Sequence, residues 1–289
     1  MITTPNQVSR VGAAIEQLSL LPSRRSPVVS QGRVNLRAEL NHFSMLVYAV
    51  PAERIAPLLP RQVKLETRLV EGREMAWLSV LSFRDQGPRH SGVGGLGGFE
   101  QTIYRVHVIH EGKAAHYLLN LSLGSLSAVA TRNLWSMPWH LSAMEFQVSY
   151  DRSAGKYREY RLQTQSQWDN AHWELTDSGR GLPIEAIDEL CLPSSLLANQ
   201  TENFFQRQDR TIGRAAIGYG EWAATRGQLK SAQSELLERL GILSREELQK
   251  PVLVLLQQQI SSTLSSPTVE GGRKAVALPA RLAHAAHAV

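Results

Sequence analysis

Alternating residues in the segment 99–109 place an acid, two hydroxyl groups and an arginine at regular spacing. The alternation predicts a β-strand, whose successive side chains point to opposite faces. One face then holds Glu100, Thr102 and Tyr104, and the other holds Gln101, Ile103, Arg105 and His107. A carboxylate such as Glu100 can accept a hydrogen bond from a ligand or exchange a proton with it. The alternative for Glu100 is a buried structural carboxylate paired with an arginine such as Arg132. Arg105 is predicted to be structural, bridging two layers of sheet.

A second polar face is predicted for the next strand, 115–123. Its polar residues His116, Asn120 and Ser122 alternate with Tyr117, Leu119, Leu121 and Leu123. If this face points inward, it lines a wet pocket. The alternative is the solvent face of an antiparallel strand.

The run 127–140 adds an arginine, a tryptophan and a histidine. Arg132 is expected on a helix that leads into this run, where its planar guanidinium could hold a carboxylate through two hydrogen bonds. Alternatively, Arg132 ties the helix to Glu100 or to a main-chain carbonyl. Trp139 and His140 close the run directly after a proline.

Other motifs carry little chemistry. The residues 92–97 match a glycine-rich dinucleotide pattern, but a predicted strand follows where the pattern needs a helix, so we predict a loop. His107 and His110 are three apart on a strand and point to opposite faces, which disfavours a shared metal ion. No serine lies in a nucleophile-elbow motif. We therefore expect no metal and no cofactor.

The surrounding elements are mostly predicted strands with a period of two. Their ranges are 40–50, 63–70, 74–83, 99–109, 115–123, 142–150, 157–168, 171–177 and 252–264. A short helix is predicted after Pro51. A longer helix is predicted from a stripe of apolar residues: Trp222, Leu229, Ala232, Leu236, Leu237 and Leu240. Gly241 is expected to end this helix, and the residues 244–247 match the pattern of a capping box for a short second helix. We expect one domain over 38–266, between mobile tails at 1–37 and 267–289.

The positive charge is concentrated in the tails. The chain of 289 residues has a net charge of +5 and a pI near 9.5. Residues 1–39 hold five arginines against two glutamates, and 267–289 hold three basic residues against one acid, so the core is neutral. This distribution disfavours a specific nucleic-acid surface. The single cysteine, Cys191, excludes an intramolecular disulfide and fits a cytoplasmic protein. No apolar run is long enough to span a membrane.

The segments 41–60, 74–83, 99–105, 127–140, 203–209 and 220–222 are similar, in this order, to an uncharacterised family, the YqjF-like family DUF2071. That family resembles acetoacetate decarboxylases in fold. The resemblance implies a mainly β (α+β) fold, an acetoacetate decarboxylase-like double-layered antiparallel β-barrel or cone. This barrel or cone would enclose a small cavity and carry helices at its periphery.

The resemblance also implies where a site would lie. In the decarboxylases, a proline followed by two lysines ends the segment that resembles 127–140, and a glutamate at the position of Glu100 faces the cavity. Here Trp139 and His140 stand at the lysine positions. Decarboxylation through an imine needs a neutral lysine amine, whose pKa is lowered by a second cation beside it. Trp139 has no nucleophile, His140 forms no stable imine, and none of the six lysines of the chain lies next to another.

These observations support a first hypothesis and two competitors. The first is a protein that binds a small carbonyl- or carboxylate-bearing molecule in the cavity without Schiff-base chemistry. Its candidate residues are Glu100 and His140 for proton transfer, and Arg132, Trp139, His116, Asn120 and Tyr104 for ligand binding. If it is an enzyme, we expect a lyase or hydrolase-like activity other than acetoacetate decarboxylation.

The second hypothesis is a non-catalytic scaffold or interaction protein whose cavity is filled by Trp139. The third is association of the basic tails with nucleic acid or anionic surfaces. The expected partner is a small molecule, with homo-oligomerisation left open and neither a membrane nor a specific nucleic acid expected.

Overall fold

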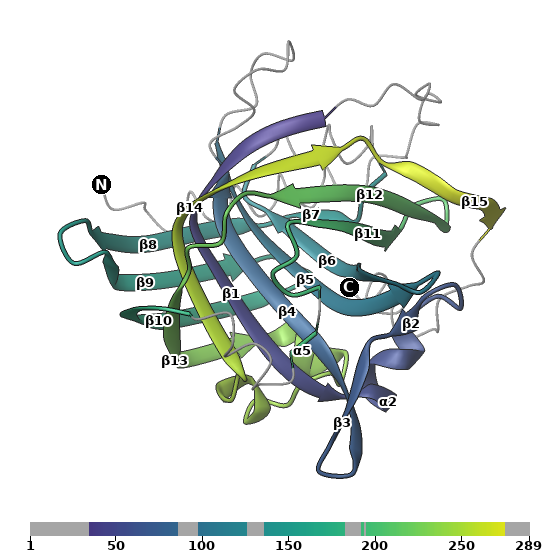
Figure 1. Cartoon of the computed structure of the whole chain (residues 1–289), viewed down its shortest axis with the longest axis horizontal. Coiled ribbons are helices and arrows are strands. Elements are labelled where there is room, and N and C mark those ends of the chain that lie inside the picture. Colours follow the sequence, from purple (N-terminus) through teal and green to yellow (C-terminus); the bar gives the residue numbers. More distant parts are fainter. Residues whose placement is uncertain (1–34, 86–97, 126–135, 183–191, 194, 275–289) are drawn as a thin grey trace.

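Fifteen strands pair into one sheet in the computed structural model, which describes residues 35–85, 98–125, 136–182, 192–193 and 195–274 (Figure 1). The strands are β1 (Asn35–Pro51), β2 (Lys64–Leu65), β3 (Thr67–Val70), β4 (Arg73–Asp85), β5 (Phe99–His110), β6 (Lys113–Leu123), β7 (Trp139–Leu141), β8 (Ala143–Asp151), β9 (Lys156–Gln165), β10 (Asn170–Gly181), β11 (Gln200–Gln206), β12 (Thr211–Tyr219), β13 (Thr225–Ser234), β14 (Leu253–Ser265) and β15 (Thr268–Lys274). The helical segments are α2 (Ala52–Ile55), η1 (Ala56–Leu58), α5 (Glu235–Arg239) and η2 (Glu247–Gln249).

Seven of the strands close into a ring. The pairing runs in the order β1, β4, β5, β6, β11, β12 and β14 and returns to β1. Two glycines allow the closing strands, β12 and β14, to approach each other. A Cβ on Gly218 would lie 2.5 Å from Thr263 Oγ1, and one on Gly220 would lie 2.4 Å from Ser261 Oγ. A side chain at either position would need the facing hydroxyl group of β14 to move away.

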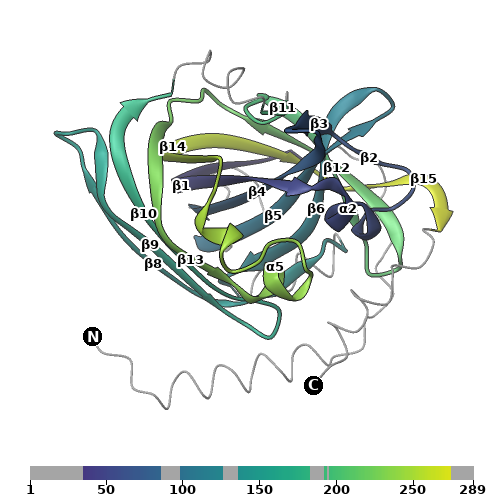
Figure 2. The same cartoon turned by 90° about the horizontal axis from the view of Figure 1, so that it is seen from below.

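Four further strands form an outer layer. This layer continues from β14 through β13 to β10, β9 and β8. Figure 2 shows it curving past the strands of the ring, with α5 at one end.

Among the described residues, one hydrophobic core lies inside the ring and another lies between the ring and the outer layer. The ring core contains buried residues from all seven ring strands, such as Met45, Leu81, Ile103 and Leu255. Because every ring strand contributes to it, this core lies inside the ring. The interlayer core contains the alternate residues of β1, β4, β5 and β6 together with residues of β8, β9, β10 and β13. The wall β1–β4–β5–β6 is therefore buried on both faces, which explains why its strands are so rich in buried residues.

A β-bulge in β6 changes which side chains face which core. Tyr104 pairs with Asn120, but Arg105 pairs with Leu118, so Leu119 has no partner on β5. The extra residue reverses the alternation on one side of the bulge. As a result, Tyr117 lies in the interlayer core whereas Leu118 and Leu121 lie in the ring core.

The mainly β fold class is confirmed, and most predicted strands form near their expected bounds. The longer helix predicted from the stripe 222–240 is wrong, because Thr225–Ser234 is strand β13, paired with β10, and only Glu235–Arg239 is helical. Strands β11 and β12 were not predicted, and β15 lies within the segment expected to be a tail.

The predicted helix ends near the C-terminus are confirmed. Ser244 N donates to Glu247 Oε2 at 2.8 Å, and Glu247 N donates to Ser244 Oγ at 3.2 Å, which is the reciprocal pair of a capping box. Gly241 follows α5 with a φ of 67°, the left-handed conformation that glycine adopts at a helix C-terminus.

Candidate functional site

The predicted site residues are divided between the two faces of the ring wall. Glu100 and Tyr104 face the outer layer, and Asn120, opposite Tyr104, lies on the same side. The expectation that His116 shares this face is wrong, because the bulge at Leu119 turns His116 into the ring, where it pairs with His107.

The two residues that stand at the lysine positions also face opposite sides. Trp139 pairs with Leu121 and lies in the ring core with 8% of its surface exposed. His140 pairs with Ser122 on the interlayer side, and its ring lies 4.0 Å from that of Trp168. Arg132, the remaining predicted ligand-binding residue, lies outside the described residues.

Glu100, which the resemblance implied to face the cavity, lies on the outer-layer side of β5 and points away from the ring interior. Its carboxylate accepts a hydrogen bond from Arg84 Nε at 3.1 Å, and Arg84 in turn lies 5.7 Å from the ring of Phe146 in the outer layer. The neighbouring Gln101 occupies the ring side of β5, with 8% of its surface exposed. Successive residues of a strand point to opposite faces, so Glu100 and Gln101 lie on opposite sides of the ring wall. Trp139 lies on the same side of this wall as Gln101.

Tyr104 belongs to a buried network that joins the two layers. Its hydroxyl donates a short hydrogen bond to Asp169, which also accepts from Ser234 Oγ at 3.2 Å and from Leu236 N at 3.0 Å. Burial raises the pKa of Asp169, although these donors favour its charged form. Asp169 thereby links β5 to the start of α5, and every member of this network has a partner.

Inside the ring, a chain of side chains runs from Glu66 to Ser79. Ser79 Oγ lies 2.7 Å from His107 Nε2, and His107 Nδ1 lies 2.7 Å from Ser195 Oγ. Ser195 Oγ in turn donates to Glu66 Oε2 at 3.4 Å. Ser79 and His107 have no exposed surface, so this chain lies entirely within the protein.

Two neutral histidines lie side by side in the ring. The rings of His107 and His116 are 4.7 Å apart and nearly perpendicular. Burial, and then the positive charge of Arg105, lower the pKa of both residues well below the usual value. The Ser195 main chain acts in the opposite direction on His116, but no hydrogen bond of good geometry reaches either of its ring nitrogens.

Arg105 is a buried cation without a counter-ion. Its side chain is 1% exposed, and none of the ion pairs among the described residues includes it. Nη2 reaches Met45 Sδ at 4.0 Å, and Nε has no hydrogen-bond partner. Burial lowers the pKa of Arg105, and the Tyr219 hydroxyl partly opposes this effect. A buried charge is normally paired, because its transfer from water costs several kcal/mol.

Further polar atoms of the ring interior lack partners. Asn203 pairs with His116 across β6 and β11, and its Oδ1 accepts no hydrogen bond. Within the part of the chain that the structure describes, the buried polar atoms of the ring without a partner include Trp77 Nε1, Arg105 Nε, His116 Nδ1, His116 Nε2 and Asn203 Oδ1. Buried polar groups are nearly always hydrogen-bonded, so this concentration of polar atoms without partners is unusual.

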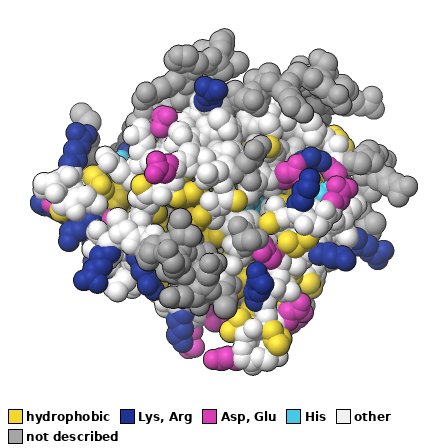
Figure 3. Space-filling model, in the orientation of Figure 1, with side chains coloured by type: hydrophobic (Ala, Val, Ile, Leu, Met, Phe, Trp, Pro, Cys, Tyr) yellow, Lys and Arg dark blue, Asp and Glu magenta, His cyan; other side chains and the backbone are white. Residues whose placement is uncertain are grey.

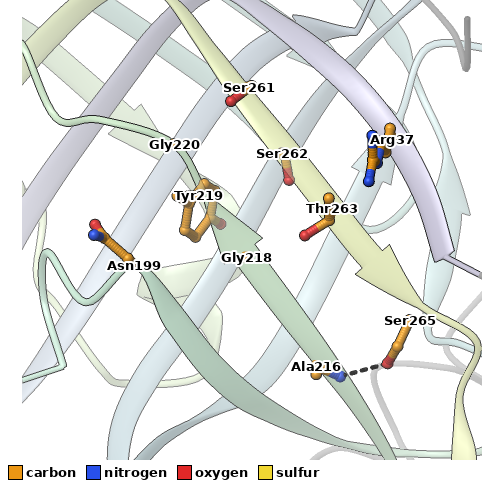
Figure 4. Close-up of a pocket in the computed structure, with 10 residues that line it drawn as sticks. All are labelled: Arg37, Asn199, Ala216, Gly218, Tyr219, Gly220, Ser261, Ser262, Thr263 and Ser265. Carbon is orange, nitrogen blue, oxygen red and sulfur yellow. Dashed lines mark hydrogen bonds between the residues drawn. The ribbon is translucent and has the colours of Figure 1, made fainter.

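A surface pocket of about 460 Å³ lies over the seam between β12 and β14. Figure 4 shows Arg37 on β1 and the hydroxyl residues Ser261, Ser262 and Thr263 on β14 around it. Tyr219 also lines the pocket, and its hydroxyl is the one that acts on Arg105. Tyr219 therefore belongs both to the lining of the pocket and to the surroundings of Arg105.

None of the lysines whose burial the structure describes lies in the ring interior. Lys64, Lys113, Lys230 and Lys250 are exposed, and Lys156 is half-buried against Gly179 in the outer layer. Among the described residues, no group of three or more His, Cys, Asp or Glu side chains could hold a metal ion.

Sequence reasoning placed Arg105 and His107 on one face correctly but gave them no role in binding. Ser79, Ser195 and Asn203 were not predicted, because they come from three separate segments that meet only in the closed ring. The available signal was the pair Arg105 and His107 on one face of a strand. An arginine at a buried strand position is unusual.

Two further observations concern membrane spans and surface charge. None of the helices in the described ranges is long and apolar enough to cross a membrane. On the face drawn in Figure 3, several Lys and Arg side chains gather on the left, and others lie among Asp and Glu side chains.

Comparison with known proteins agrees with this architecture. The family model of DUF2071, described as an uncharacterized conserved protein, matches residues 37–260, and the chain belongs to this family. No curated protein matches the sequence.

Solved structures show the fold class. The chain is similar to the acetoacetate decarboxylase from Legionella pneumophila, with a TM-score of 0.55 and 15% identity over 92% of this chain and 96% of that one. It is also similar to an acetoacetate decarboxylase-like enzyme from Sphingomonas wittichii, with a TM-score of 0.50 and 9% identity over 88% and 99% of the two chains. The protein therefore has the acetoacetate decarboxylase-like fold.

Proposed function

We propose that the ring interior binds a small molecule that bears a carboxylate and a carbonyl group. The observation that carries this proposal is Arg105, which is buried and has no anionic partner. A carboxylate at the guanidinium would neutralise the charge and could accept two parallel hydrogen bonds from it. Binding would then recover part of the free energy that the buried charge costs in the empty protein.

The remaining interior groups suit a carbonyl compound. His116 and Asn203 lie beside each other on the ring face, and both have polar atoms without partners. A neutral imidazole offers one donor and one acceptor, so this pair can hydrogen-bond a ligand carbonyl or hydroxyl group. No described lysine is available to form an imine, which favours chemistry other than that of a Schiff base.

A second candidate function is a scaffold or interaction protein whose ring is filled. Trp139 favours it, because this indole is buried in the ring core where the decarboxylase resemblance places a lysine. The two candidates differ in what they predict for Arg105. A filled scaffold has no ligand to pair with this cation, whereas a binding protein needs the cation for affinity. For both, we propose a cytoplasmic location, in line with the single cysteine.

A thermal-shift screen tests the binding function. We expect pyruvate and acetoacetate to raise the melting temperature of the full chain, and the uncharged amides pyruvamide and acetoacetamide to raise it much less. Borohydride added with either keto acid should leave every lysine unmodified by mass spectrometry. Equal shifts with acids and amides, or no shift with any of them, would contradict the proposal, and a reduced lysine adduct would contradict the exclusion of imine chemistry.

A further inference from the structure

The chain Glu66–Ser195–His107–Ser79 has a fixed direction of hydrogen bonding. Ser195 Oγ donates its proton to Glu66 Oε2. Ser195 Oγ is then free to accept from His107, which places the imidazole proton on Nδ1. His107 Nε2 is left as an acceptor, and Ser79 donates its hydroxyl proton to it.

This direction is the one that activates a serine. A hydroxyl becomes a useful nucleophile when a neutral base accepts its proton and a third group holds the base in the correct tautomer. Burial and the charge of Arg105 keep His107 neutral by lowering its pKa. The distance of 2.7 Å between Ser79 Oγ and His107 Nε2 is within the range needed for proton transfer.

Ser79 also stands beside the proposed carboxylate anchor. It pairs directly with Arg105 across β4 and β5, so both side chains point into the ring. Directly opposed residues have Cβ atoms about 5 Å apart. A ligand whose carboxylate lies on Arg105 would therefore have its next few atoms close to Ser79.

We propose that Ser79 is the nucleophile of an acyl-transfer reaction on small carboxylate-bearing esters, with His107 as the general base. Ser195 and Glu66 are positioning residues that orient His107. This inference rests on the proposed function, since it takes Arg105 as the group that anchors the substrate.

The reaction has two balanced steps. In the first, Ser79 Oγ bonds to the ester carbonyl carbon while its proton passes to His107 Nε2. The bond from that carbon to the leaving oxygen breaks, and the leaving alcohol takes the proton from His107. In the second step water attacks the Ser79 ester, with His107 again accepting and returning a proton, and releases the acid and free Ser79.

A pair of chromogenic esters tests this chemistry on the full chain. The first is acetoxynitrobenzoate, an aryl acetate that carries a carboxylate, and the second is nitrophenyl acetate, which lacks it. We expect a rapid burst of one nitrophenolate per chain with the first ester, and one acetyl group on the Ser79 peptide by mass spectrometry. Ser79→Ala should abolish both the burst and the acetylation, because it removes the attacking oxygen. Ser82→Ala is the matched control, because Ser82 is buried on the opposite face of β4 and bonds Thr102.

The positioning residues are tested by the pH profile of the burst. The charged and titratable groups around His107 are Arg105, His116 and Glu66. Ser195→Ala should shift the apparent pKa of the burst rate, whereas Ser195→Thr, which keeps the hydroxyl, should retain the original profile. A purely structural Ser195 would change the amount of folded protein and leave that pKa in place.

The outcomes separate this inference from the proposed function. A burst that survives in Ser79→Ala, or acetylation only at other residues, overturns the nucleophile assignment. If keto acids bind through Arg105 but Ser79 is never acetylated, the inference alone fails. Suppose that Ser79 is acetylated at equal rates by both esters and that Arg105→Met leaves these two rates unchanged. The carboxylate anchor and the proposed function then fail.

Discussion

The polar networks on the two faces of β5 differ in how completely their groups are hydrogen-bonded. On the outer face, the Tyr104 hydroxyl, Asp169 and Glu100 all have hydrogen-bonded partners, and they join the ring to the outer layer. On the ring face, Arg105, His116 and Asn203 keep polar atoms without partners. Satisfied networks stabilise a fold, whereas unsatisfied buried groups cost stability and are retained where a ligand completes them. This contrast supports a structural role for the outer network and the proposal that the inner face binds a ligand.

The largest effect on stability is expected at Asp169. Asp169→Ala removes the acceptor of three buried donors, each of which costs about 1–3 kcal/mol when left unsatisfied. We expect the free energy of unfolding, measured by urea titration, to fall by roughly 4 kcal/mol. Tyr104→Phe, which removes one donor of the same network, should cost much less. A loss below about 1 kcal/mol for Asp169→Ala would show that the outer network is not structural.

The adjacent residues Trp139 and His140 should differ strongly because they face different cores. Trp139→Ala leaves a cavity in the ring core and should lower the free energy of unfolding by about 3 kcal/mol. His140→Ala removes a half-buried ring contact with Trp168 and should cost less than about 1 kcal/mol. Equal costs for the two variants would mean that the division between the cores is misplaced.

A smaller effect is expected from pH. His107 and His116 have lowered pKa values in the folded protein, so below the unfolded value of about 6.5 the unfolded chain binds more protons. Stability is therefore fully present above that pH and falls as the pH drops from about 6.5 towards 5. His42 contributes with the same sign.

The variant His116→Leu removes the titration of one of these histidines and so measures its share of the pH dependence. No nitrogen of His116 has a hydrogen-bond partner, so the variant removes the titration without leaving another group unpaired. The slope of unfolding free energy against pH should decrease by up to about 1.4 kcal/mol per pH unit. An unchanged slope in urea titrations at several pH values would place the proton uptake elsewhere.

The smallest stability effect is expected at Arg105. Replacing a buried, unpaired charge by an apolar side chain of similar length removes a desolvation cost. Arg105→Met should therefore leave the free energy of unfolding within about 1 kcal/mol of the original value, or raise it. A loss as large as that of Asp169→Ala would show that the ring face is held together by Arg105 and would end the contrast between the two faces.

The alternation of residues was sufficient to predict most strands, because a strand buried on one or both faces records its period in the sequence. It failed where pairing over long distances decides the structure. Leu229 and Ala232 suit a helical stripe equally well, yet they lie in β13 because β10 offers a hydrogen-bonding edge. The glycines of β12 weaken a strand pattern, although Gly218 is needed for the close approach to β14.

The site was harder to predict than the fold. A single unpaired residue, Leu119, turns His116 from the predicted polar face into the ring, and nothing local in the sequence marks the bulge. The hydrogen-bonded chain of the ring also draws Glu66 and Ser195 from segments 129 residues apart. Such a constellation exists only after the ring closes.

The most direct test of the central claim is a calorimetric titration of the keto acids into the original protein and Arg105→Met. Arg84→Met is the matched control, because Arg84 is a partly exposed arginine on the outer face that pairs with Glu100. We predict that pyruvate or acetoacetate binds the original protein and Arg84→Met alike, and that Arg105→Met loses at least about 10-fold in affinity, or about 1.4 kcal/mol, while remaining folded. Equal affinity of all three proteins for these acids, or no binding to any of them, would contradict the assignment of the ring interior as a carboxylate site.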